Sequence, residues 1–168
     1  MILKIYTLIH VLISLMGILS GFVVICGLLT ANPLDGWTAF FLATTVLTSV
    51  TGFFFPFQRL LPSHIVGIIS LVVLAVAIYA RYYGHLAGAW RWLYLVGAVL
   101  AQYLNFFVLV VQCFQKIPAL KTLAPTQTEP PFKLTQTVVL VLFVVLGIAT
   151  VIKFHIWRPL QNSIERSF

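Results

Sequence analysis

Amide side chains inside an apolar stretch are the residues of this chain best able to do chemistry. Gln102, Asn105 and Gln112 follow one another at spacings of three and seven residues, which places them on one face of a helix. Because hydrocarbon offers no hydrogen-bond partner, we expect this face to point inward, toward another helix, a bound ligand or trapped water. Two hypotheses follow. The amides bond neighbouring helices, which is their commoner use, or they line a site for a quinone-like headgroup.

Histidine is the second residue type with a chemical use, since membrane helices bind haem b through pairs of inward histidines at matching depth. The predicted helix order brings His10 and His64 toward one membrane face, and His85 and His155 toward the other. His64 follows Pro62 and His85 lies in a glycine-containing turn, which are positions typical of interfacial polar residues. Only His10 lies well within an apolar stretch, so it is the candidate ligand if haem b is bound. The sequence otherwise predicts no cofactor and no metal site.

Acidic residues are too few and badly placed for membrane-embedded catalysis or proton coupling. The three acids, Asp35, Glu129 and Glu165, fall in predicted connections or in the tail, so no paired carboxylates can form inside a bilayer. The chain also has no GxSxG, HExxH, CxxC or phosphate-binding glycine motif. We therefore predict that it is not an enzyme.

The composition indicates which elements position these residues. Apolar residues make up 61% of the 168 residues and charged residues only 8%, far outside the range of soluble domains. Five stretches are each long enough to cross a hydrocarbon core about 30 Å thick. The sequence predicts an all-α membrane protein, with a single domain over 1–168 built as a bundle of five transmembrane helices at about 2–30, 37–55, 63–83, 90–115 and 134–155.

Small and hydroxyl-bearing residues on the first two predicted helices indicate close helix packing. Gly17 and Gly21 form a small-xxx-small pair, which allows two helix backbones to approach each other. Hydroxyls on the second helix can bond carbonyls of the preceding turn. The candidate packing residues are Ser14, Gly17, Gly21, Thr44, Thr48 and Gly52.

The longest predicted connection, 117–133, contains four prolines, so extended or turn geometry is expected there rather than another helix. Each proline removes conformational freedom, which makes the connection a pre-ordered surface. This surface either docks a partner or simply packs on headgroups. The candidate docking residues are Lys116, Lys121, Glu129 and Lys133.

Charge gives only a weak indication of orientation. The net charge of +7 comes from lysines and arginines placed singly around helix ends, which indicates lipid headgroups and no nucleic acid. Five crossings place the two termini on opposite faces, and five basic residues fall on each face. Because Lys4 precedes the first helix and no Lys or Arg lies between Ala31 and Phe57, we place the amino terminus in the cytoplasm.

Three segments are more specified than membrane crossing requires: Gly52-Phe53-Phe54-Phe55-Pro56-Phe57, Gln115-Lys116-Ile117-Pro118-Ala119-Leu120 and Ala124-Pro125-Thr126-Gln127-Thr128-Glu129-Pro130-Pro131-Phe132. Together with the amides of the fourth helix, the chain resembles an uncharacterised family of small multi-pass bacterial inner-membrane proteins, from about the second helix into the fifth. This resemblance implies a bacterial cytoplasmic membrane and no activity.

These observations favour a non-catalytic multi-pass subunit or accessory protein that assembles with itself or with a larger membrane complex. A binder of a lipophilic cofactor or ligand is the alternative, with haem b at His10 or a quinone-like molecule at Gln102, Asn105 and Gln112. A small oligomeric channel or transporter is a second alternative, and it would have to select without charged pore residues.

Overall fold

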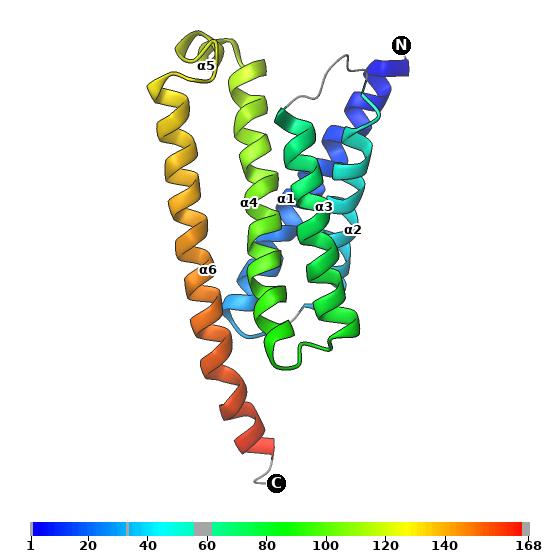
Figure 1. Cartoon of the computed structure of the whole chain (residues 1–168), viewed down its shortest axis with the longest axis vertical. Helices are drawn as coiled ribbons and strands as arrows, with labels where there is room; N and C mark the ends of the chain where they lie inside the picture. Colours follow the sequence, from blue (N-terminus) through cyan, green and yellow to red (C-terminus); the bar gives the residue numbers. More distant parts are fainter. Residues whose placement is uncertain (1, 33, 56–61, 166–168) are drawn as a thin grey trace.

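Every regular element in the described part of the chain is a helix (Figure 1). The computed structural model describes residues 2–32, 34–55 and 62–165, with the side chains of residues 62, 63 and 154–165 outside that description. The all-helical prediction is confirmed. The elements are α1 (Ile2–Leu29), α2 (Asp35–Gly52), α3 (Pro62–Ile78) with a π-helical end (Tyr79–Tyr83), α4 (Ala89–Lys116), α5 (Pro118–Leu123) and α6 (Pro130–Glu165).

Four stretches in the described residues are long and apolar enough to cross a membrane, which supports the prediction of a membrane protein. They are Ile2–Leu29, His64–Tyr83, Ala89–Lys116 and Pro130–Lys153. The helix α2 is not one of them, because its 18 residues begin with Asp35 and include six that carry a hydroxyl group. Length and apolar composition therefore identify four helices that could cross a membrane and leave α2 as a more polar helix.

The polar helix α2 packs between α1 and α3 and runs antiparallel to both (Figure 1). Its first residue, Asp35, pairs with Arg81 at the end of α3. Near its other end, the carbonyl oxygen of Thr51 accepts a hydrogen bond from Tyr6, close to the start of α1. The chain thus reaches the far end of the bundle through α2 before α3 begins.

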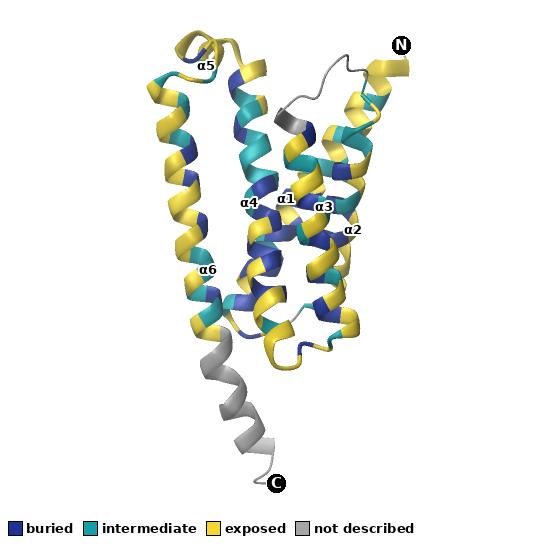
Figure 2. Cartoon of the chain, in the orientation of Figure 1, coloured by how far each residue is buried: buried dark blue, intermediate teal, exposed yellow. Residues whose placement is uncertain are grey.

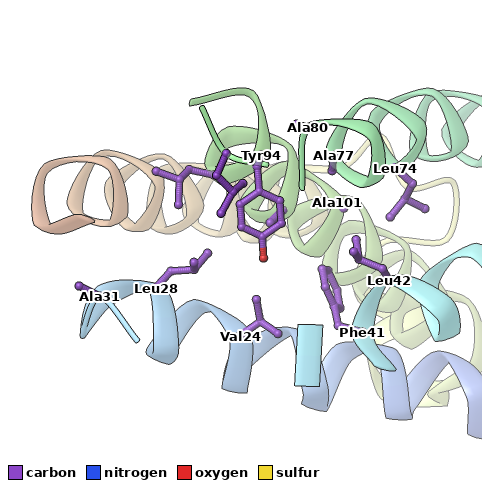
Figure 3. Packing of buried hydrophobic residues seen from close by; sticks show 13 residues of the cluster. Val24, Leu28, Ala31, Phe41, Leu42, Leu74, Ala77, Ala80, Tyr94 and Ala101 are labelled. Carbon is purple, nitrogen blue, oxygen red and sulfur yellow. The ribbon is translucent and has the colours of Figure 1, made fainter. Parts of the chain in front are cut away.

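The central helix α4 contacts α1, α3 and α6 and contributes to two apolar clusters. In the first cluster, the Tyr94 ring of α4 is 1% exposed and stands among apolar side chains of α1, α2 and α3 (Figure 3). Labelled neighbours in that view include Val24, Phe41 and Leu74. This packing fixes α4 against the first three helices.

A second cluster joins α4 to α6 through aromatic rings. The Phe143 ring of α6 lies 5.8 Å from Phe106 and 5.9 Å from Tyr103, both on α4, and 6.3 Å from Phe22 on α1. Up to Lys153 the rest of α6 is largely exposed, with its buried residues directed toward the bundle (Figure 2). The helix α6 is therefore a peripheral element anchored along one side.

The prediction of a connection without helix over 117–133 is wrong. The six-residue helix α5 begins at Pro118, and α6 begins at Pro130, not at about residue 134. Proline is favourable at the first position of a helix, where its missing N–H has no intrahelical partner to lose. The last helix also extends to Glu165 and so passes the predicted end at about residue 155.

Candidate functional site

Five residues of α2 bond, through the side chain or the backbone, to three neighbouring helices at successive levels of the bundle. Together they form what we call the polar ladder: Asp35, Thr38, Thr45, Ser49 and Thr51. A polar helix needs such partners, since an unpaired polar group in hydrocarbon costs several kcal/mol. The ladder is therefore the part of the structure where side-chain chemistry is concentrated.

At one end of the ladder, Asp35 pairs with Arg81 of the π-helical turn, whose side chain is 7% exposed. The Arg81 guanidinium also lies 5.0 Å from the centre of the Tyr94 ring. The Tyr94 hydroxyl in turn donates to Thr38 over 3.4 Å. These contacts tie the start of α2 to both α3 and α4.

Sequence reasoning missed this group of contacts, because Arg81 was interpreted as an interfacial anchor and Asp35 as a connection residue. A usable signal did exist. Asp35 is the only acid between residues 1 and 128, so a partly buried arginine in that region had one possible carboxylate partner.

In the middle of the bundle, Gln102 is fully buried and donates from Nε2 to the carbonyl oxygen of Ile18 on α1 over 2.7 Å. Its Oε1 atom has no conventional hydrogen-bond partner among the described residues. That oxygen lies against Gly21, so close that a Cβ atom at residue 21 would be 2.0 Å from it.

The second amide, Asn105, donates from Nδ2 to the Thr45 hydroxyl over 3.1 Å and so joins α4 to α2. Gly17 lies opposite this pair. A Cβ atom added at residue 17 would lie in ordinary van der Waals contact with the side chains of Thr44, Thr45 and Asn105. The amides of α4 therefore reach two different helices, α1 through Gln102 and α2 through Asn105.

Gln112 does not share the inward face that its spacing predicts, because its side chain is exposed. It lies one turn before the end of α4, between Val110 and Phe114, which are buried. The expectation of one inward face for all three amides is wrong for this residue. At this level α4 buries Val110 and Phe114 in the second apolar cluster, and both lie on the side of the helix opposite Gln112.

His10 bonds to the ladder through Nδ1, which lies 2.8 Å from the Thr51 hydroxyl oxygen. That hydroxyl is also 2.6 Å from the carbonyl oxygen of Leu47, which can only accept. The Thr51 hydroxyl therefore donates to Leu47 and accepts from His10, which assigns the proton to Nδ1 and leaves the lone pair on Nε2. The His10 ring also packs edge-on against Phe55, with 5.0 Å between ring centres.

The other candidate histidine with a described environment, His64, is 5% exposed and packs on the Phe53 ring at 5.6 Å between centres. His85 is exposed in the turn after the π helix, and the side chain of His155 lies outside the described residues. Across the described ranges, no three His, Cys, Asp or Glu side chains come together as a metal site would require.

The remaining packing candidates lie on the α1–α2 contact. The Ser14 hydroxyl donates to the carbonyl oxygen of His10 over 2.7 Å, and the Thr44 hydroxyl donates to that of Phe40 over 2.7 Å. The Thr48 hydroxyl is buried without a partner in the described part of the chain. A Cβ atom at Gly52 would lie 3.9 Å from the His10 ring.

A shallow apolar groove of about 410 Å³ opens at the carboxyl end of α1. Neither the α4 amides nor His10 lines it, so the polar ladder and the groove are separate features. Its lining residues are Phe22, Val23, Cys26, Gly27, Thr30, Asn32 and Leu34.

The candidate docking residues lie around α5. Lys116, Lys121 and Lys133 are exposed, and Glu129 is partly exposed just before α6. The Glu129 carboxylate accepts hydrogen bonds from the Thr126 hydroxyl over 2.8 Å and from the backbone N–H groups of Thr126 and Thr128 over 3.1 and 3.0 Å. Desolvation would raise the pKa of Glu129, but these hydrogen bonds outweigh it and hold that pKa below its usual range.

Comparison of the chain with family models, curated proteins and solved structures gave no match.

Replacing Gly21 with alanine is expected to destabilise the bundle, because the new methyl group would displace Gln102 and break its bond to Ile18. We expect a loss of about 1–3 kcal/mol in the free energy of unfolding in detergent. When Gln102 is already replaced by alanine, Gly21→Ala should lower the free energy of unfolding by at least about 1 kcal/mol less than it does in the unmodified chain. Gly36→Ala is the matched control, since a Cβ atom there meets no atom within 4 Å. An equal loss of unfolding free energy with and without the Gln102 side chain would contradict the contact between Gly21 and Gln102.

The turn closed by Glu129 is expected to open in acid. A carboxyl group whose pKa is lowered in the folded state stabilises the fold above its unfolded pKa, and this contribution is lost as pH falls through the folded value. Hydrogen exchange at the Thr126 and Thr128 amides, corrected for intrinsic rates, should therefore speed up as the pH falls through the lowered pKa of Glu129. Glu129→Gln should give faster exchange already at neutral pH. The Ala124 amide, bonded to Leu120, is the internal control. Unchanged protection in the variant would refute the assignment.

Proposed function

We propose that this chain is a non-catalytic, multi-pass subunit of the bacterial cytoplasmic membrane that assembles with copies of itself or with a larger membrane complex. The observation that carries the proposal is that the polar ladder bonds helices to one another. Its groups, with Gln102 and Asn105, bond one helix to another inside the bundle. A group engaged in holding helices together is not presented to a substrate.

The proposal includes five crossings, with α2 as the polar inner one. The argument is geometric. Since α2 runs antiparallel between α1 and α3, its start lies beside the end of α3 and its end lies beside the start of α1. If α1 and α3 both cross the bilayer, α2 must cross as well. Its polar side chains then find partners on the flanking helices and not in lipid.

The exposed lysines support a cytoplasmic amino terminus. Lys4, Lys116, Lys121 and Lys133 are exposed on the face that carries the start of α1. On the opposite face, among the side chains that the structure describes, Arg81 is buried against Asp35, Arg91 is partly buried and Lys153 is exposed. The side with more exposed basic residues is expected in the cytoplasm.

The surface proposed for assembly lies on α6. Exposed β-branched residues follow one another along this helix at alternating spacings of three and four, the pattern by which helices interlock side chains. Van der Waals packing of such a strip can hold two helices together in lipid. The strip consists of Val138, Val141, Val145, Ile148 and Ile152.

Cysteine labelling of the two ends of α2 tests the five crossings. In a chain with Cys26 and Cys113 replaced by alanine, cysteines at Gly36 and Phe54 should react with a membrane-impermeant maleimide from opposite sides. In spheroplasts we expect Gly36→Cys to label directly, together with Ala87→Cys. Phe54→Cys and Lys121→Cys should label only after permeabilisation. Labelling of Gly36→Cys and Phe54→Cys from the same side would exclude a crossing by α2.

Size measurement after gentle extraction tests assembly. Native mass spectrometry of the detergent-solubilised chain should show an oligomer or a stoichiometric partner. The pair Val145→Ala and Ile148→Ala should shift the population toward the single chain, since the truncated side chains lose packing contacts. Ile69→Ala with Val72→Ala is the control, because both residues are exposed on α3. A single chain without partners in the unmodified protein would refute the proposal.

A further inference from the structure

The connection between α4 and α6 has a fixed fold of its own. We call residues 116–133 the hairpin platform. Within it, Ala124 is 1% exposed, and Phe132 packs edge-on against Phe114 of α4 at 5.3 Å between ring centres. The Gln127 side chain donates to the carbonyl oxygen of Val111 on α4 over 3.2 Å. These contacts hold the platform against the end of α4, so its outer residues are presented in a defined arrangement.

The outer residues of the platform carry positive charge that the platform does not neutralise. Lys116, Lys121 and Lys133 are exposed, at the end of α4, in α5 and in the first turn of α6. The one acid in residues 116–133 is Glu129. Its carboxylate is occupied by Thr126 and Thr128, which closes the turn before α6. The carboxylate keeps its charge, so residues 116–133 carry a net charge of +2, and no ion pair among the described residues engages the three lysines.

Apolar side chains lie among these lysines. Ile117 is 45% exposed and Leu123 is 57% exposed, one at each end of α5. Because the platform connects two helices that are long and apolar enough to cross a membrane, it lies at the level of the lipid headgroups. An apolar residue at that level enters the boundary with the acyl chains, while a lysine keeps its ammonium group among the phosphates.

We propose that the hairpin platform binds anionic phospholipid headgroups of the leaflet in which it lies. Lys116, Lys121 and Lys133 contact the phosphates, and Ile117 and Leu123 enter the acyl boundary. Each lysine near an anionic leaflet adds to the attraction, and the platform's fixed fold limits the entropy lost on binding. The paired apolar residues favour a bilayer over an acidic protein segment, which would need no acyl boundary. The inference requires α4 and α6 to cross the membrane and does not depend on assembly.

Hydrogen exchange of the whole chain in lipid nanodiscs tests this inference. The amides of residues 117–123 are compared in phosphatidylcholine alone and in phosphatidylcholine containing phosphatidylglycerol. We expect slower exchange when phosphatidylglycerol is present, and we expect this protection to weaken at high salt. The protection should be lost in the triple variant K116Q/K121Q/K133Q. It should persist in the control K4Q/K153Q, which removes lysines elsewhere, and in the charge-preserving K116R/K121R/K133R.

Three results would overturn the inference. The first is equal exchange in both lipids for the unmodified chain. The second is phosphatidylglycerol-dependent protection that persists in the glutamine triple variant. The third is a protein that co-purifies with the unmodified chain, is absent from the triple variant and protects α5 equally in both lipids, since that would identify the platform as a protein-binding surface. Exchange along α4 and α6 reports whether the triple variant folds, and the arginine variant tests the charge if it does not. Oligomer size is measured separately, so a failure of the proposed assembly is distinguishable.

Discussion

The structure depends on the need to find hydrogen-bond partners inside the bundle for the polar helix α2, whose first residue, Asp35, is exposed. The helix α2 carries six hydroxyl groups and an aspartate within 18 residues, so it cannot lie in lipid by itself. The polar ladder resolves this, because its five levels bond three neighbouring helices: α3 at Asp35 and Ser49, α4 at Thr38 and Thr45, and α1 at Thr51. Single bonds of this kind contribute only about 0.6 kcal/mol on average between membrane helices. Their distribution over three helices gives the bundle one arrangement, since rotating α2 would break every level at once.

The helix α4 connects the polar helix α2 to the rest of the bundle. Through Gln102 and Asn105 it reaches α1 and α2, and on its other side the aromatic cluster around Phe143 holds α6. The close approach that Gln102 requires explains why residue 21 has no side chain. The outer surfaces make none of these interhelical contacts. The exposed strip of α6 and the lysines of the hairpin platform are therefore the places where contact with another subunit or with lipid can develop without disturbing the interior.

Periodicity and composition were sufficient to predict an all-helical chain, its long apolar helices and the inward direction of Gln102 and Asn105, but not the helix α5 or the start of α6 at Pro130. They were insufficient where a residue's role depends on a distant partner. Nothing near Arg81 in the sequence shows that it meets Asp35, 46 residues away, or that a π-helical turn directs it inward. Gln112 shares the spacing of the other amides, but at its level α4 buries the opposite side, with Val110 and Phe114, in the second apolar cluster. In the sequence, Pro118 is as compatible with the end of a helix as with the first residue of one. In the structure, the packing of Ala124 and Phe132 accompanies the second choice, a helix that begins at Pro118.

The measurement that tests the account most directly compares two threonines one turn apart on α2. Thr45 accepts a hydrogen bond from Asn105, whereas the buried Thr48 hydroxyl has no partner among the described residues. Valine replaces the hydroxyl in both cases with little change in shape. The account predicts that Thr45→Val lowers the free energy of unfolding in detergent by about 1 kcal/mol or more, because the partly buried Asn105 amide loses its acceptor. Thr48→Val should be neutral or stabilising. Equal effects of the two changes would contradict the claim that the polar ladder holds α2 in the bundle.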